Sequence, residues 1–370
     1  MAVAQARVEA QCGVEVVSRG ERDMNRGLVV LRPDSDDHLH ALRVAVGLLG
    51  PAIVLLAVGR PELMIFAVFG AFTGMYGRTD VGRQRQVHQL AAAVLLVISV
   101  AIGVLLAHLQ VATWLLVVVV SAFAIVVSLI ADALRLRPVG PFFFLFAVGA
   151  TAVLPAGLVQ PGVAIAICAG TAVLALAVGS VGVSRGATWP AAPGARWRGG
   201  PDGPMLPPGA WAHAARYGIA IGLAGGVGTF LGFAHANWAM ASAAVPLAAM
   251  GAPRADGREI RLVLSRSAHR VIGTFVGLAV TAVVLAAGMS PSILAALMVV
   301  LLFPTELFMV RHYAVAVGFF TPLIMLMCEL AAPTDPLTLI GYRGLDTLIG
   351  VVIGVSVAIA VRGRRPSVRS

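Results

Sequence analysis

The chain of 370 residues is 59% hydrophobic and only 12% charged, and its mean hydropathy is +0.92. A soluble domain carries about 25% charged residues, so this composition excludes a water-soluble enzyme, which could not bury so many apolar side chains. The apolar residues fall in unbroken runs of roughly 20, the length that crosses about 30 Å of hydrocarbon. The composition therefore predicts an all-α polytopic membrane protein.

The net charge of +10 comes entirely from arginine, because all 27 basic residues are Arg. A nucleic-acid interface would gather them on one face with interleaved aromatic residues, whereas here they lie between the apolar runs, as orientation signals do. We therefore expect the lipid bilayer as a partner and no nucleic acid. We also expect no metal and no cofactor. Assembly into a homo-oligomer is compatible with the sequence.

About twelve transmembrane helices are expected. In the first half they cover 40–58, 62–77, 88–108, 111–131, 139–157 and 162–183. In the second half they cover 211–233, 237–252, 268–289, 291–309, 312–332 and 344–361. The expected domains are a cytoplasmic tail over 1–38, a six-helix half over 39–184, a Pro/Gly-rich cytoplasmic linker over 185–210, a six-helix half over 211–362 and a cytoplasmic tail over 363–370. The polar residues 1–38 contain no apolar run of the kind found in a cleaved signal peptide.

The loop charges predict the orientation of these spans. With the N-terminus inside, 25 arginines fall on the cytoplasmic side and two, Arg60 and Arg343, fall outside. This asymmetry is typical of the positive-inside rule. It predicts a multi-pass protein of the plasma (inner) membrane with both termini cytoplasmic.

The two halves of the sequence resemble each other. The motif His-x-x-Arg begins the first span at His40 and the seventh span at His213. Asp132 follows the fourth span and Glu306 lies at the end of the tenth, so the two acids occupy matching places in the two halves. Six spans per half let both copies enter from the same side, so we expect two parallel six-helix repeats.

A second pattern suggests inverted repeats of three plus three helices inside each half. Arg270 and Thr274 are expected to open the ninth span, and Arg343, Asp346 and Thr347 to open the twelfth, which runs in the opposite direction. Guanidinium and hydroxyl groups near two helix N-termini favour anion binding, since the helix dipole is positive there. We therefore predict that the two arginines and two threonines bind the substrate.

Ionisable groups inside a membrane are costly and are often functional. Glu306, Asp346 and Asp132 are the candidates for a proton-coupling or pore-lining acid. The alternative is that these acids snorkel to the interface, or that Arg343 and Asp346 merely pair as neighbours three apart on one helix.

Trp238 is a further candidate for substrate binding. Asn237 and Trp238 open the eighth span, so Trp238 is expected to anchor its outer end at the lipid headgroups. The alternative is that the indole stacks on an aromatic substrate.

Glycines spaced four apart at Gly273 and Gly277, and at Gly350 and Gly354, predict close packing of helices. The loop Asp80-Val-Gly-Arg-Gln-Arg85 is similar to the signature loop of major facilitator transporters, although the Arg expected after the Asp is missing.

The second half resembles the fusaric acid resistance family, which is related to aromatic acid exporters and to aluminium-activated malate transporters of plants. The motifs that carry the resemblance are Tyr217, Asn237-Trp238-Ala239, His269-Arg270-Val-Ile-Gly273-Thr274-Phe-Val-Gly277, Arg311-x-Tyr313, Phe320-Thr321-Pro322-Leu323 and Arg343-x-x-Asp346-Thr347-x-x-Gly350. They cover roughly residues 211–361, and the resemblance is weaker over 40–183. Many members also carry a sizeable cytoplasmic domain, where this chain has only a short linker.

The resemblance implies a membrane transporter that exports small organic anions such as aromatic carboxylic acids. Alternatives are an anion-conducting channel of the malate-channel type and a major-facilitator-like transporter. A membrane scaffold without transport activity and an intramembrane enzyme are the least expected alternatives. The enzyme is disfavoured because the sequence has no HExxH motif and no Asp-rich pair for Mg²⁺–diphosphate. We therefore expect no enzymatic activity.

Overall fold

The computed structural model describes residues 35–78, 80, 82–180, 206–207, 209–232, 236–250 and 258–361. Most of the tail expected over 1–38, most of the linker over 185–210 and all of the tail over 363–370 lie outside these residues.

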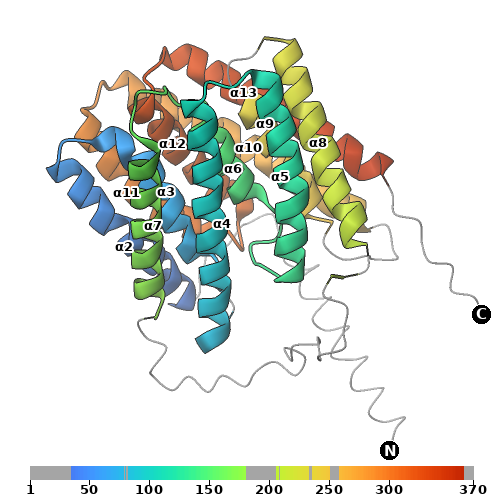
Figure 1. Cartoon of the computed structure of the whole chain (residues 1–370), viewed down its shortest axis with the longest axis horizontal. Helices are drawn as coiled ribbons and strands as arrows, with labels where there is room; N and C mark the ends of the chain where they lie inside the picture. The colour runs from blue at the N-terminus through green and yellow to red at the C-terminus, as the bar shows by residue number, and fades with distance from the viewer. Residues whose placement is uncertain are drawn as a thin grey trace, which may run out of the picture. The chain divides into compact units, whose positions relative to one another are not determined.

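The described chain contains twelve α-helices, two short 3-10 helices and no strand (Figure 1). The first half comprises α2 (Ser35–Ala57), η1 (Pro61–Leu63), α3 (Met64–Ala71), η2 (Phe72–Met75), α4 (Gly82–His108), α5 (Thr113–Ala133), α6 (Phe142–Ala152) and α7 (Pro161–Ser180). The second comprises α8 (Ala210–Phe230), α9 (Ala236–Ala248), α10 (Arg258–Ala286), α11 (Pro291–Phe308), α12 (Tyr313–Ala331) and α13 (Pro336–Ala360).

Eight of the described helices are long and apolar enough to cross a membrane, namely α2, α4, α5, α7, α10, α11, α12 and α13. Helices α3, α6 and α9 are shorter, with 8, 11 and 13 residues. Because a helix rises about 1.5 Å per residue, none of these three spans the roughly 30 Å of hydrocarbon. The prediction of an all-helical polytopic membrane protein is thus confirmed, whereas twelve full spans are not.

The short helices are the buried ones. All eight residues of α3 are buried, as are residues 143–151 of α6 and 236–247 of α9. The long helices instead expose large apolar side chains such as Val54, Val118 and Val283, as expected of surfaces in contact with lipid. A short helix enclosed by longer ones need not span the bilayer alone, and its side chains face protein on every side.

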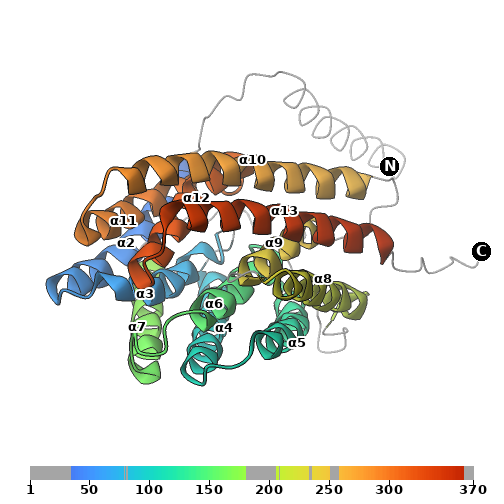
Figure 2. The ribbon, with the colours of Figure 1, turned by 90° about the horizontal axis from the view of Figure 1, so that it is seen from above.

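Helix pairs in the first half have counterparts in the second. Helix α3 packs on α7 as α9 packs on α13, and α6 packs on α4 as α12 packs on α10. Between the halves, α2 contacts α11 and α5 contacts α8. Helices α10 and α13 lie side by side (Figure 2).

Glycines allow the closest of these approaches, as predicted. A Cβ at Gly273 or Gly277 of α10 would collide with the backbone of α12. A Cβ at Gly350 or Gly354 of α13 would likewise collide with backbone atoms of α9. Small residues four apart thus bring α10 and α13 against two inner helices.

The predicted starts of two helices are wrong. Helix α10 begins at Arg258, ten residues before the expected start, and α13 begins at Pro336, eight residues before it. The sequence over 258–261 is Arg-Glu-Ile-Arg, so charge places the expected start of α10 late. In α13 the residues before Arg343 include Leu337, Leu339 and Ile340, which belong to the apolar span. The charge of Arg343 interrupts that run, so the expected start falls after it. Arg270 and Arg343 consequently lie about three and two turns inside their helices, beyond reach of the helix dipole, which acts within the first turn.

Candidate functional site

Two arginines lie in the protein interior. Arg270 of α10 is 1% exposed and Arg343 of α13 is 0% exposed, and both rank among the largest fully buried side chains. We call these two residues the arginine pair. The predicted helix N-termini do not place them there. They are instead held by the packing of α10 and α13 against each other and against the inner helices.

Most donors of the arginine pair have no hydrogen-bond partner among the described residues. Nε and Nη2 of Arg270, and all three guanidinium nitrogens of Arg343, make no hydrogen bond within the described part of the chain. A buried charge without a partner costs several kcal/mol. Such a cost is tolerated where the unsatisfied group has a functional ligand.

The two guanidinium groups share one region of the interior. Arg270 lies near enough to Arg343 for the two positive charges to act on each other. The guanidinium carbon of Arg343 lies 5.3 Å from the centre of the Trp238 ring, and that of Arg270 lies 5.0 Å from the centre of the Phe142 ring. Two repelling cations on aromatic faces form a region of positive potential suited to an anion.

Asp346 lies one turn after Arg343 on α13 and is 0% exposed. Neither carboxylate oxygen accepts a hydrogen bond from the residues described. The expected alternative, a simple pairing of Arg343 with Asp346, is therefore not seen, although the two charges are close enough to influence each other. The snorkelling alternative is also wrong for Asp346, because the side chain is enclosed by protein.

The two predicted threonines differ. The hydroxyl of Thr274 is buried and has no hydrogen-bond partner among the described residues, whereas that of Thr347 donates to the Arg343 carbonyl at 2.8 Å. The Thr347 hydroxyl thus donates its hydrogen bond to the backbone of its own helix. Thr321 of α12, which was not predicted as a site residue, is buried against Gly277 and its hydroxyl likewise has no partner among the described residues.

The expected role of Trp238 as a headgroup anchor is wrong. Its side chain is 1% exposed and lies within α9, an inner helix, so it has no access to the lipid interface. The amphipathic character of an indole indicates an interface only when the helix that carries it faces lipid. The stacking alternative is compatible with this position.

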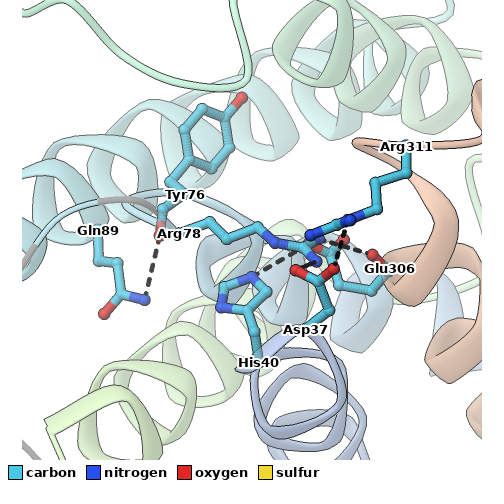
Figure 3. A network of polar contacts seen from close by, with 7 residues as sticks. All are labelled: Asp37, His40, Tyr76, Arg78, Gln89, Glu306 and Arg311. Atoms are coloured by element: carbon cyan, nitrogen blue, oxygen red, sulfur yellow. Dashed lines mark hydrogen bonds and ion pairs between the residues drawn. The ribbon is translucent and has the colours of Figure 1, made fainter. Parts of the chain in front are cut away.

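A second group of charges lies where α2 meets α11, and we call it the ionic network (Figure 3). Arg78 donates to the Asp37 carboxylate at 2.7 Å and to the Glu306 carbonyl at 2.8 Å. Arg311 donates to the other Asp37 oxygen at 2.9 Å, and His40 Nε2 lies 3.1 Å from Glu306 Oε1. Each acid in this network therefore contacts a cationic or basic side chain.

The three predicted acids consequently fall in three different places. Asp346 lies with the arginine pair, and Glu306, only 2% exposed, lies in the ionic network. Asp132 is half-buried at the end of α5, near Tyr217 of α8. Only Asp346 of these three is thus close to the arginine pair.

Phe142 was not predicted as a site residue, because it belongs to the other half of the sequence and follows no motif shared with α10. The sequence does place four phenylalanines close together, at Phe142, Phe143, Phe144 and Phe146. The spacing of these phenylalanines in the sequence does not predict which ring packs against an arginine of the second half.

Residues 223–357 match a family model described as fusaric acid resistance protein-like. No curated protein and no solved structure matches the chain. The matched segment includes the arginine pair, Asp346 and Trp238, and excludes Phe142 and Asp132. The resemblance predicted from the motifs of the second half is thereby confirmed: residues 223–357 of this multi-pass membrane protein are similar to the fusaric acid resistance family.

Proposed function

We propose that the protein transports small organic anions, such as aromatic carboxylates, out of the cell, and that Arg270 and Arg343 bind the anionic group. The observation that carries the proposal is the arginine pair, in which Nε and Nη2 of Arg270 and all three guanidinium nitrogens of Arg343 are buried without hydrogen-bond partners among the described residues. Arginine presents a planar fork of donors that matches a carboxylate. The family resemblance of residues 223–357 supports a transporter.

The remaining polar groups complete the site in this proposal. Thr274 supplies a hydroxyl on the same helix as Arg270, one that no described residue bonds. Trp238 holds the face of the Arg343 guanidinium and offers an aromatic surface to the substrate. Thr347 contributes by fixing the α13 backbone at Arg343, since its hydroxyl is already bonded there.

Asp346 is the best-placed acid for coupling transport to protons. It shares a helix face with Arg343, and an ionised Asp346 would compete with the substrate for that guanidinium. Protonation of Asp346 would free Arg343 to bind the anion, and loss of the proton would favour release. Glu306 and Asp132 lie elsewhere, and we propose that they act at the contacts between the halves, α2 with α11 and α5 with α8.

Alternating access explains the enclosure of the site better than an open channel does. Arg343 is completely buried, so an anion reaches it only when packed helices separate. The matching helix contacts of the two halves support a parallel repeat, the arrangement in which many transporters rock one half against the other. The arginine distribution supports a plasma-membrane protein with both termini in the cytoplasm.

The proposal is tested with inside-out vesicles that contain the full-length protein. Accumulation of labelled benzoate is measured with and without a pH gradient, for the wild type and for Arg270→Met. Arg266→Met is the matched control, because Arg266 lies one turn earlier on α10 and stacks on the Tyr313 ring. We expect Arg270→Met to abolish accumulation and Arg266→Met to retain it. Equal accumulation by all three proteins would contradict the proposal.

A further inference from the structure

The aromatic rings that face the arginine pair come from both halves of the chain. Arg343 lies over Trp238 of α9, in the second half, and Arg270 lies over Phe142, the first residue of α6, in the first half. Helices α6 and α9 pack on each other, as do α10 and α13. One pair of helices thus carries the cations, and another pair carries the rings.

A ring on the face of a guanidinium leaves its donors free. The cation–π contact uses the flat face, whereas the N–H groups lie in the plane and point outward at the edge. Nε and Nη2 of Arg270 are the atoms without partners among the described residues. An aromatic face can therefore stabilise and orient this buried cation without competing with an anion for its donors.

Phe142 is itself held in place. Its ring is nearly parallel to that of Phe146, one turn further along α6, with an interplanar angle of 4° and a centroid separation of 6.0 Å. On another side it lies 6.2 Å from the Phe320 ring of α12. Gly140, with φ of +91°, makes the turn that leads into α6, and only glycine adopts such a backbone readily. The ring position is therefore set by a helix start, a stacked ring and a neighbouring helix.

We propose that Phe142 is a positioning residue for anion binding, which holds the Arg270 guanidinium with its edge donors free. The inference rests on the proposed function of the arginine pair. It adds that the site is completed by a residue of the first half, outside the segment that matches the family model. The alternative is that Phe142 only fills space in the aromatic cluster.

The test uses the full-length protein in detergent and measures benzoate affinity by titration calorimetry. Phe142→Leu keeps an apolar side chain but removes the π face, so we expect affinity to fall about tenfold. Phe142→Tyr keeps the face, so we expect affinity within about twofold of wild type. Phe144→Leu is the matched control, because Phe144 lies on the same helix but stacks on Tyr76 at 5.5 Å instead of on an arginine.

Phe144 is also more deeply buried than Phe142, so a purely structural effect would make Phe144→Leu the more harmful change. Equal loss of affinity in both leucine variants, or no rescue by Phe142→Tyr, would overturn the inference. Arg270→Met is measured alongside. If it abolishes binding while Phe142→Leu matches Phe144→Leu, only the inference fails. If Arg270→Met binds benzoate normally, the proposed function fails, and the inference fails with it.

Discussion

The arginine pair is fully buried and the ionic network is mostly buried, with Arg311 at its exposed edge, and the partners of the two groups differ. In the network, Asp37 is bonded by Arg78 and Arg311, and Glu306 contacts His40 and Arg78. In the arginine pair, Nε and Nη2 of Arg270 and all three guanidinium nitrogens of Arg343 have no hydrogen-bond partner among the described residues, and the nearby Asp346 accepts no hydrogen bond from them. In the first arrangement each acid has a basic partner within the protein, although Glu306 Oε2 accepts no hydrogen bond from the described residues. The second arrangement, in our proposal, is completed by a ligand.

This difference separates two uses of buried charge. Removing one member of a buried ion pair leaves its partner buried and unpaired, which is strongly destabilising. Removing a cation that has no partner instead relieves a desolvation cost. Stability and transport should therefore respond in opposite ways to substitutions in the two groups.

The largest effect is expected for Arg343→Met. Loss of a buried cation that binds an anion should weaken benzoate binding about a thousandfold, equivalent to about 4 kcal/mol. The apolar methionine fills a similar space, so the unfolding temperature should stay the same or rise. Calorimetric titration and thermal unfolding of the same preparation check both expectations. A large fall in the unfolding temperature would place Arg343 with the structural charges and break the comparison.

Glu306→Leu should show the opposite behaviour. It leaves His40 and Arg78 without the carboxylate they contact, so we expect destabilisation by about 3 kcal/mol. Benzoate affinity, measured on the fraction that remains folded, should be close to that of wild type. Asp37→Asn is a control expected to destabilise less. The Asp37 side chain is more exposed than that of Glu306, and asparagine keeps one acceptor oxygen for the arginines. A stable Glu306→Leu protein that has lost its response to a pH gradient would instead identify Glu306 as the coupling acid.

Arg343→Lys separates the effect of charge from that of geometry, because lysine keeps the positive charge but lacks the planar set of guanidinium donors. Lysine cannot bond a carboxylate through two parallel donors, so we expect affinity to fall about tenfold, equivalent to about 1.4 kcal/mol. Binding of chloride, which gains nothing from a planar fork, should change little. Similar losses for benzoate and chloride would indicate that only the charge matters.

The smallest effect concerns Asp335, an exposed acid with local partners. Its Oδ2 accepts from the Thr338 amide at 2.8 Å and from the Thr338 hydroxyl at 2.7 Å, and these bonds lower the pKa of Asp335 from its ordinary value. A lowered pKa stabilises the fold above the unfolded value, and the benefit is lost as the pH falls through the folded value. Asp335→Ala should therefore be slightly less stable than wild type at pH 7, and the difference in unfolding temperature should shrink as the pH is lowered through the folded pKa. A difference that is the same at all pH values would point to another cause.

The sequence predicts the helical class and most helix positions well, because long apolar runs and the loops between them are local features. It places α11 within one residue of its observed bounds at both ends. It places the starts of α10 and α13 too late, because the charged residues over 258–261 and the single charge of Arg343 fall outside the predicted spans. That error also supplied the wrong reason for selecting the two arginines: their burial, and not a helix dipole, makes them candidates for an anion site.

Contacts between distant segments were harder to predict. The matching places of Asp132 and Glu306 in the two halves suggest equivalent roles, yet Glu306 contacts His40 and Arg78 of the first half, whereas Asp132 lies near Tyr217. Phe142 and Arg270 likewise meet only because α6 and α10 fold into the same interior. Such pairings depend on tertiary packing, which a single sequence does not reveal.

The most direct test of the arginine pair as an anion site is the unfolding temperature as a function of benzoate concentration. Binding to the folded state alone raises this temperature. The wild type should therefore become more stable as benzoate is added. The double variant Arg270→Met with Arg343→Met should be at least as stable as wild type without benzoate and should not respond to it. A double variant that is less stable than wild type, yet gains the same stability from benzoate, would contradict the account.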